Sequence, residues 1–271
     1  TYGVGEMILH AIENGCRDFV IGIGGSATND GGIGMLKALG FEFLDKDGKD
    51  VGEGGQALAK VSVIKFDKVN SKLSLCNFKV ACDVINPLCG ENGATFIYGP
   101  QKGVTPEMRD DLDQGMKNFA TQTASYLGTN HSDYPGAGAA GGLGFAFLSF
   151  LNATLTPGVD LILDAVGFEQ ALAHEVNACE PLIVVTGEGR LDHQTAMGKA
   201  PVGVARLAKK YGAKVIAFAG AVTKDAITCN DAGIDAFFPI VREITTLEEA
   251  MKPENAKENL TATAEQVFRL L

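Results

Sequence analysis

The stretch PLIVVTGEGRLDHQTAMGKAPVGVARLAKKYGAKVIAFAG, residues 181–220, holds two short apolar runs on either side of an amphipathic segment. PLIVVTG and AKVIAFAG are apolar almost throughout, which is typical of parallel strands buried on both faces. GKAPVGVARLAKKYG, between them, has its apolar residues at helical spacing. Because strand–helix–strand alternation is the signature of a parallel sheet, the sequence predicts an α/β fold.

The first part of the chain predicts further strands and helices around one long helix. That helix covers residues 105–127, with a threonine cap and a proline at its first position. FEFLDKDGKDV predicts a hairpin around Asp47-Gly48. The other predicted elements are strands in residues 17–25, 61–67, 78–84 and 234–240 and helices in residues 32–39 and 143–151.

The sequence pattern changes near Glu175–Cys179, so we predict two domains, residues 1–175 and 176–271. The second contains only three clear parallel strands, fewer than open parallel sheets usually have. We therefore expect strands from a missing N-terminal piece to complete that sheet.

Composition excludes several classes of partner. The chain has 271 residues, of which 46% are hydrophobic and 21% charged, and a net charge of −10 with no long basic run. These values argue against binding to nucleic acid or to an anionic membrane. No signal peptide is visible, and the longest apolar stretch is too short to cross a bilayer. The six cysteines form no CxxC pair, which predicts buried, reduced thiols in a cytoplasmic protein.

The segment IGIGGSATNDGG, residues 21–32, follows a predicted strand and contains several candidate ligand-binding residues. Its glycines match a dinucleotide fingerprint in part, but Thr28 to Gly32 delay the helix and Asp30 would repel a pyrophosphate. A nest of backbone N–H groups with nearby hydroxyls suits a phosphate or a carboxylate instead, while a carboxylate suits Mg²⁺ or a substrate hydroxyl. A tight turn with no ligand remains the alternative. The candidates are Gly24, Gly25, Ser26, Thr28, Asn29 and Asp30.

A second group of polar residues follows the strand at residues 181–187, where α/β proteins bind their ligands. Two cations, Arg190 and Lys199, could bind phosphates or a carboxylate. Glu188 and Asp192 could orient a hydroxyl or hold Mg²⁺. The alternative is a helix-capping loop with surface charges. Next to it, His193 does not predict a hydrolase triad, because the chain has no GxSxG motif.

Two more segments complete the candidate site. Asp83 and Asn86 follow the strand at residues 78–84, either as site residues or as an Asx-turn. PGAGAAGGLGFAFLSFL, residues 135–151, is rich in glycine and alanine, so its backbone must lie close to another helix or to a ligand. The chain has no P-loop motif, so any ATP must bind to another kind of loop.

Four segments together, GGSATNDGG, CDVINPLCGENGATFIYGPQKG, PGAGAAGGLGFAF with PGVDLILD, and TGEGRLDHQTAMGKAPVGVA, closely resemble the type I glycerate kinases. This bacterial family phosphorylates D-glycerate with ATP. The resemblance implies ATP and Mg²⁺ as cofactors and two α/β domains, with the ligand cleft between them. One domain is flavodoxin-like and incomplete here, because residues 176–271 would be only its C-terminal part. The other is an inserted α/β domain with a mixed sheet, and residues 1–175 would be the larger part of it.

The chain departs from the family pattern at its start. Family members begin with a strand and an Asp-Ser-Phe-Lys motif and later carry Asp-Gly-Gly-Glu-Gly-Thr, and neither motif occurs here. We therefore expect this chain to lack the N-terminal segment of a kinase. A fragment that binds glycerate or nucleotide without reacting is the first alternative, and a nicotinamide-dependent hydroxy-acid oxidoreductase is the second.

The resulting hypothesis is phosphoryl transfer to a small hydroxy acid. The loop at residues 24–32 would hold phosphate, with Asp30 near a metal ion or the substrate. Asp192 would orient or deprotonate the glycerate hydroxyl, and Arg190 and Lys199 would neutralise the carboxylate or the phosphoryl group. The sequence leaves open which hydroxyl reacts, which domain binds adenine, and whether the protein forms a homodimer.

Overall fold

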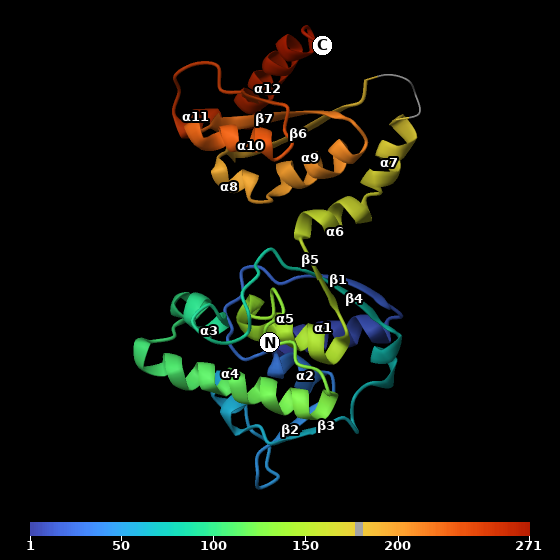
Figure 1. The fold of residues 1–271 in the computed structure, drawn as a ribbon, viewed down its shortest axis with the longest axis vertical. Helices are drawn as coiled ribbons and strands as arrows, with labels where there is room; N and C mark the ends of the chain where they lie inside the picture. The colour runs from blue at the N-terminus through green and yellow to red at the C-terminus, as the bar shows by residue number, and fades with distance from the viewer. Residues whose placement is uncertain (177–180) are drawn as a thin grey trace. The chain divides into compact units, whose positions relative to one another are not determined.

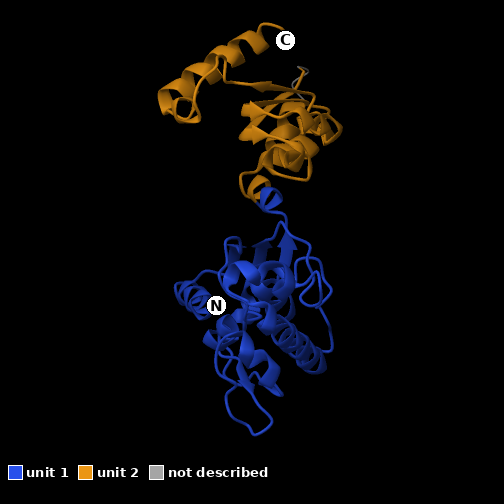
Figure 2. Cartoon of the chain, turned by 90° about the vertical axis from the view of Figure 1, so that its left-hand side faces the viewer, with its two compact units in different colours: residues 1–161 blue, residues 162–271 orange. Residues whose placement is uncertain are grey.

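A three-stranded parallel sheet lies in each of the two units of the computed structural model, Thr1–Leu161 and Ile162–Leu271 (Figure 2). The structure describes residues 1–176 and 181–271. This architecture confirms the predicted α/β fold with parallel sheets. The division into domains at residue 175 stays a prediction, since Cys179 and its neighbours lie outside the described residues. No helix in the described ranges is long and apolar enough to span a membrane.

In unit 1, the parallel sheet has the order β1-β4-β5 and a separate antiparallel pair is formed by β2 and β3 (Figure 1). Parallel and antiparallel strands therefore belong to two sheets rather than to one mixed sheet. The elements are α1 (Tyr2–Glu13), β1 (Asp18–Gly22), α2 (Ile33–Ala38), β2 (Glu42–Leu44), β3 (Val63–Lys65), β4 (Asn77–Ala81), α3 (Ala94–Tyr98), α4 (Pro106–Leu127), α5 (Ala139–Leu151), β5 (Thr154–Thr156) and, across the boundary, α6 (Gly158–Ala165).

The predicted hairpin and the predicted long helix are both present in unit 1. Asp45 N–H donates to the Lys49 carbonyl at 2.8 Å, and Leu44 bridges to Asp50, which closes the turn at Gly48. Helix α4 begins at Pro106 as predicted, although the Thr105 side chain makes no capping hydrogen bond.

Helix α5 forms the centre of the unit 1 core, as its apolar sequence predicts. Phe145 and Phe147 are fully buried, and the Phe145 ring meets Phe119 of α4 edge to face, with centroids 5.7 Å apart. Figure 1 shows α5 beside α4, and α5 also contacts β4. This helix therefore joins the sheet to the long helix through one continuous core.

The start of α5 packs directly against the loop that follows β1. Ala140, Gly141 and Gly142 have left-handed backbone angles, with φ of 54°, 69° and 90°. Gly31 N–H donates to the Gly141 carbonyl at 2.9 Å, and a methyl group at Gly141 would lie 2.0 Å from the Thr28 carbonyl oxygen. The close neighbour that the sequence predicted for this segment is thus the backbone of another loop.

In unit 2, the parallel sheet has the order β6-β7-β8, which confirms the three predicted strands. Gly187 of β6 allows close approach, since a methyl group there would lie 2.3 Å from the Phe218 carbonyl oxygen. The elements are α7 (Phe168–Glu175), β6 (Ile183–Leu191), α8 (His193–Ala196), α9 (Ala200–Lys210), β7 (Lys214–Val222), α10 (Thr228–Asp231), β8 (Ala236–Pro239), α11 (Leu247–Ala250) and α12 (Pro253–Phe268).

The prediction of buried thiols holds only in part. Every cysteine outside residues 177–180 is free, which agrees with the predicted reduced state. Cys229 is buried, but Cys16 is exposed. Burial raises the pKa of the Cys89 thiol to about 12, and the Asp113 carboxylate adds to this effect. Such thiols are poor nucleophiles at neutral pH.

We expect Gly141→Ala to destabilise unit 1 by roughly 3 kcal/mol or more, because the methyl group would force two backbone segments apart and strain the left-handed residue. Gly128→Ala is the matched control: φ is 73° there, but no atom lies within 4 Å of the added methyl. It should cost only the strain of about 1–2 kcal/mol. Urea unfolding measures both, and equal losses would show that the contact is unimportant.

Candidate active site

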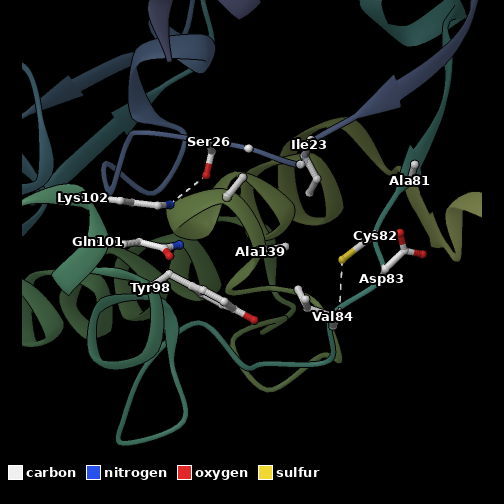
Figure 3. Close-up of a pocket in the computed structure, with 13 residues that line it drawn as sticks. Ile23, Ser26, Ala81, Cys82, Asp83, Val84, Tyr98, Gln101, Lys102 and Ala139 are labelled. Atoms are coloured by element: carbon white, nitrogen blue, oxygen red, sulfur yellow. Dashed lines mark hydrogen bonds between the residues drawn. The ribbon is translucent and has the colours of Figure 1, made fainter. Parts of the chain in front are cut away.

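A cavity of about 230 Å³ lies in unit 1 where β1 and β4 end (Figure 3). The two strands are parallel neighbours, so their carboxyl ends lie at the same edge of the sheet. Residues 23–26 follow β1 and residues 81–84 come at the end of β4, and both segments line the cavity with Tyr98, Gln101 and Lys102. The predicted residues Gly24, Gly25, Ser26 and Asp83 are thus brought together.

Lys102 supplies positive charge to this cavity. Its ammonium donates to Ser26 Oγ at 2.8 Å and to the Thr28 carbonyl oxygen at 2.8 Å. Burial lowers the pKa of Lys102, and the Asp30 charge opposes this effect. Both hydrogen bonds go to neutral oxygens, and an ammonium has three donors. Within the described residues, Lys102 is therefore a half-buried cation that donates to two uncharged oxygens.

Asp83 lies on the opposite side of the same cavity from Lys102 (Figure 3). Its Oδ1 accepts a hydrogen bond from Gly158 N–H at 2.8 Å, which fixes the carboxylate at the end of β4. The side chain is otherwise exposed. The cavity thus offers the Lys102 cation, which suits a small molecule that carries an anionic group.

Asn86 does not line this cavity, although the sequence suggested it as a binding residue. Its Oδ1 accepts from the Tyr98 hydroxyl at 2.6 Å, and its Nδ2 donates to the Asn92 carbonyl at 2.8 Å. Both ends of the amide are therefore used within the protein. Asn86 supports Tyr98, whose ring does line the cavity.

The later part of the loop, Thr28 to Asp30, lines a second cavity of about 270 Å³ in unit 1. Asp30 is only 5% exposed. Its Oδ1 accepts from Gly32 N–H at 3.0 Å, and its Oδ2 accepts from the Thr1 hydroxyl at 2.6 Å. No group of three His, Cys, Asp or Glu side chains arranged to hold a metal occurs in the described ranges. Asp30 is therefore held by hydrogen bonds from Gly32 and Thr1, and its role as a metal ligand stays a prediction.

In unit 2, Asp192 lies directly after β6 and caps α8. Its Oδ1 accepts from the N–H groups of Gln194 at 3.0 Å and Thr195 at 3.3 Å, and the Lys199 ammonium is 3.6 Å from the same oxygen. Arg190 Nε lies 4.0 Å from Oδ2. Partial burial alone would raise the pKa of Asp192, but the Lys199 charge and the two N–H groups lower it below its usual value. Asp192 is therefore held in its charged form.

Glu188 and Arg190 lie within β6, not in a loop as the sequence suggested. The strand continues because it pairs with β7 as far as Leu191↔Val222. Glu188 accepts a short hydrogen bond from the Thr195 hydroxyl. The structure thus groups Glu188, Arg190, Asp192 and Lys199 around the end of one strand, and we call these residues the unit 2 group.

His193 pairs with Asp225 and not with Asp192. Its Nδ1 lies 3.3 Å from Asp225 Oδ2, and both side chains are more than half exposed, at 57% and 54%. This geometry agrees with the prediction that His193 is an exposed residue.

The loop at residues 21–32 also agrees with prediction. Helix α2 begins only at Ile33, so the glycines of this loop are not followed directly by the helix that a dinucleotide site requires.

Comparison with known proteins decides the family. The model of the glycerate kinase family matches residues 1–271. This chain belongs to the glycerate kinase family. The predicted lack of an N-terminal segment has no support in this match. The alternative of a nicotinamide-dependent oxidoreductase is not favoured.

Several relatives of the glycerate kinase family resemble this chain along almost its whole length. A glycerate kinase of Bacillus subtilis (strain 168) is 45% identical over 98% of this chain and 68% of its own length. Glycerate 2-kinase of Escherichia coli (strain K12) is 43% identical over 96% of this chain and 68% of its own length. The crystal structure of the protein assigned as glycerate kinase 2 from Salmonella typhimurium LT2 matches with a TM-score of 0.83 and 44% identity, over 98% of this chain and 67% of that one.

Sequence reasoning for this glycerate kinase family member gave no role to Lys102, Tyr98 or Thr195 in the two groups. Lys102 and Ser26 are separated by 76 residues, so no local pattern joins them. The available signal was the segment YGPQKG, where a lysine follows a Pro-containing turn close to the Asp83 segment. Thr195 could be found from its spacing, because a threonine at the third helical position completes a capping box.

We expect Asp30→Ala to destabilise the protein by about 1–3 kcal/mol, because it leaves buried donors without an acceptor. Asp45→Ala is the control: Asp45 Oδ1 also accepts from two backbone N–H groups, of Asp47 and Lys49, each at 2.9 Å, but at the surface of the hairpin. It should cost less than about 1 kcal/mol. Urea unfolding with and without Mg²⁺ measures both. Stabilisation of the wild type by Mg²⁺ that Asp30→Ala abolishes would support the metal role.

Proposed function

We propose that the chain, as a kinase of this family, transfers a phosphoryl group from ATP to a hydroxyl of D-glycerate. The observation that carries the proposal is the half-buried Lys102 ammonium in the unit 1 cavity, which donates hydrogen bonds to two neutral oxygens. Holding a cation in a partly desolvated place costs free energy unless an anion binds there. Lys102 is therefore suited to bind the anionic group of a substrate.

The size of the cavity favours the acid over the nucleotide as its ligand. Its volume of about 230 Å³ is below the roughly 300 Å³ at which pockets for drug-sized ligands begin. A three-carbon acid fits such a space. We assign the glycerate carboxylate to Lys102, with Ser26 beside it.

The charged residues of the unit 2 group can stabilise the charge that moves during phosphoryl transfer. The reaction depends mainly on positioning and on neutralising the phosphoryl oxygens. Arg190 and Lys199 supply two cations close to Asp192. Because Asp192 stays charged, it serves better to orient a hydroxyl or a cation than to gain a proton at neutral pH.

Mg²⁺ belongs to this proposal as the ion that accompanies ATP. It usually keeps several waters and binds through one or two carboxylates together with substrate phosphates, so it needs no preformed group of three protein ligands. Glu188 and Asp192 are the carboxylates of the unit 2 group that could contribute. The ion would supply positive charge to the phosphates.

We expect Lys102→Met to weaken D-glycerate binding at least about tenfold, because a hydrogen bond to a charged group contributes about 1.5–3 kcal/mol. ATP binding should be unchanged. Isothermal titration with each ligand measures both, with the exposed Lys60→Met as control. A variant that loses ATP and keeps glycerate would assign the cavity to phosphate instead.

We expect Asp192→Asn to lower kcat about 100-fold or more, a loss typical of a removed electrostatic contact in an active site. The fold should persist, because asparagine caps helices as well as aspartate does. The neighbouring His193→Gln is the control and should keep wild-type turnover. A coupled assay for ADP release measures all three proteins.

The same assay separates the remaining alternatives. Glycerate-dependent ADP release by the wild type supports the kinase, and binding of glycerate and ATP without ADP would support a non-catalytic fragment. Near-normal turnover by Asp192→Asn would remove the role assigned to that residue while leaving the kinase proposal intact.

A further inference from the structure

Thr195 is a buried polar residue of unit 2 to which the proposed chemistry gives no role. Its side chain is 0% exposed. The hydroxyl oxygen accepts from Asp192 N–H at 3.2 Å, and the hydroxyl donates to Glu188 Oε1. The Thr195 N–H donates to Asp192 Oδ1 at 3.3 Å. One residue therefore contacts both carboxylates at the end of β6.

Helix capping explains only part of this arrangement. A capping box needs the Asp192 side chain to accept from the Thr195 N–H, and the Thr195 side chain to accept from the Asp192 N–H. The box would be complete without any contact to Glu188. The hydroxyl proton is a separate donor, and it points to a carboxylate seven positions earlier in the chain.

The Glu188 side chain is held by the Thr195 hydroxyl, which donates to its Oε1. Glu188 is only partly buried. A glutamate loses about 1.5–2 kcal/mol of rotamer freedom when it is ordered. If that order is established before the substrate binds, the cost does not add to the reaction barrier.

We propose that Thr195 is a positioning residue of the kinase reaction. Its hydroxyl holds one carboxylate oxygen of Glu188, so that the other oxygen keeps a fixed orientation within the unit 2 group. This inference rests on the proposed function, because it assumes that the unit 2 group takes part in phosphoryl transfer.

The test compares two substitutions at one position. Thr195→Val removes the hydroxyl with little change of shape and should lower kcat about 10- to 100-fold, with both KM values changed by less than about threefold. Thr195→Ser keeps the hydroxyl and should retain at least about a third of kcat. Thr123→Val is the matched control, since Thr123 is also 0% exposed but its hydroxyl, within the described structure, has no partner. It should leave kcat unchanged.

A double-mutant cycle with Glu188→Gln shows whether Thr195 acts through Glu188. On that background, Thr195→Val should lower kcat by less than about twofold further, since coupled residues are not additive. Losses that multiply, or a Thr195→Ser variant as slow as Thr195→Val, would overturn the inference and indicate a structural cap. If Thr195→Val does not fold, Thr195→Ala carries the same test.

One measurement does not depend on turnover. A hydroxyl proton buried against a carboxylate exchanges slowly, so proton NMR should show it for Thr195 and should show it moved in Glu188→Gln. Wild-type protein that releases no ADP with glycerate would refute the proposed function, and the NMR signal would then decide the Thr195–Glu188 contact separately. Full turnover by Glu188→Gln would overturn the inference even with an active wild type.

Discussion

The contact between two backbone segments, residues 28–32 and 140–142, determines how the rest of unit 1 is arranged. Gly31 and Gly141 are joined by a hydrogen bond of 2.9 Å, and no side chain separates the segments. The contact fixes the Thr28 carbonyl, which Lys102 then reaches together with Ser26. The position of the cation in the cavity is thus a consequence of glycine packing several residues away.

The charges of Lys102 in unit 1 and Asp192 in unit 2 have opposite kinds of surroundings. Lys102 donates to two neutral oxygens and feels the charge of Asp30 without a hydrogen bond to it, so the cation stays able to attract an anion. Asp192 has two cations and two N–H donors around it, so its charge is already stabilised before any ligand arrives. The first arrangement favours binding, and the second favours a fixed electrostatic environment, which phosphoryl transfer requires.

Sequence reasoning succeeded where the signal was local and failed where it depended on distant pairing. The strands, the hairpin and helix α5 follow from apolar periodicity and turn residues within short windows. The extension of β6 through Arg190 depends on pairing with β7, and the place of Lys102 depends on a contact across 76 residues. The binding role predicted for Asn86 stays a prediction, because a polar residue after a strand can bind a ligand or support a neighbour such as Tyr98.

Asp192 shows that a structural explanation and a functional one can hold for the same side chain. Capping of α8 uses Oδ1, which accepts both N–H bonds. The other oxygen, Oδ2, has Arg190 Nε at 4.0 Å, beyond hydrogen-bond distance. The cap therefore fixes the carboxylate without using its second oxygen. A residue that must hold a charge in a precise place benefits from such support, so the capping role strengthens the case for Asp192 as part of the reactive group.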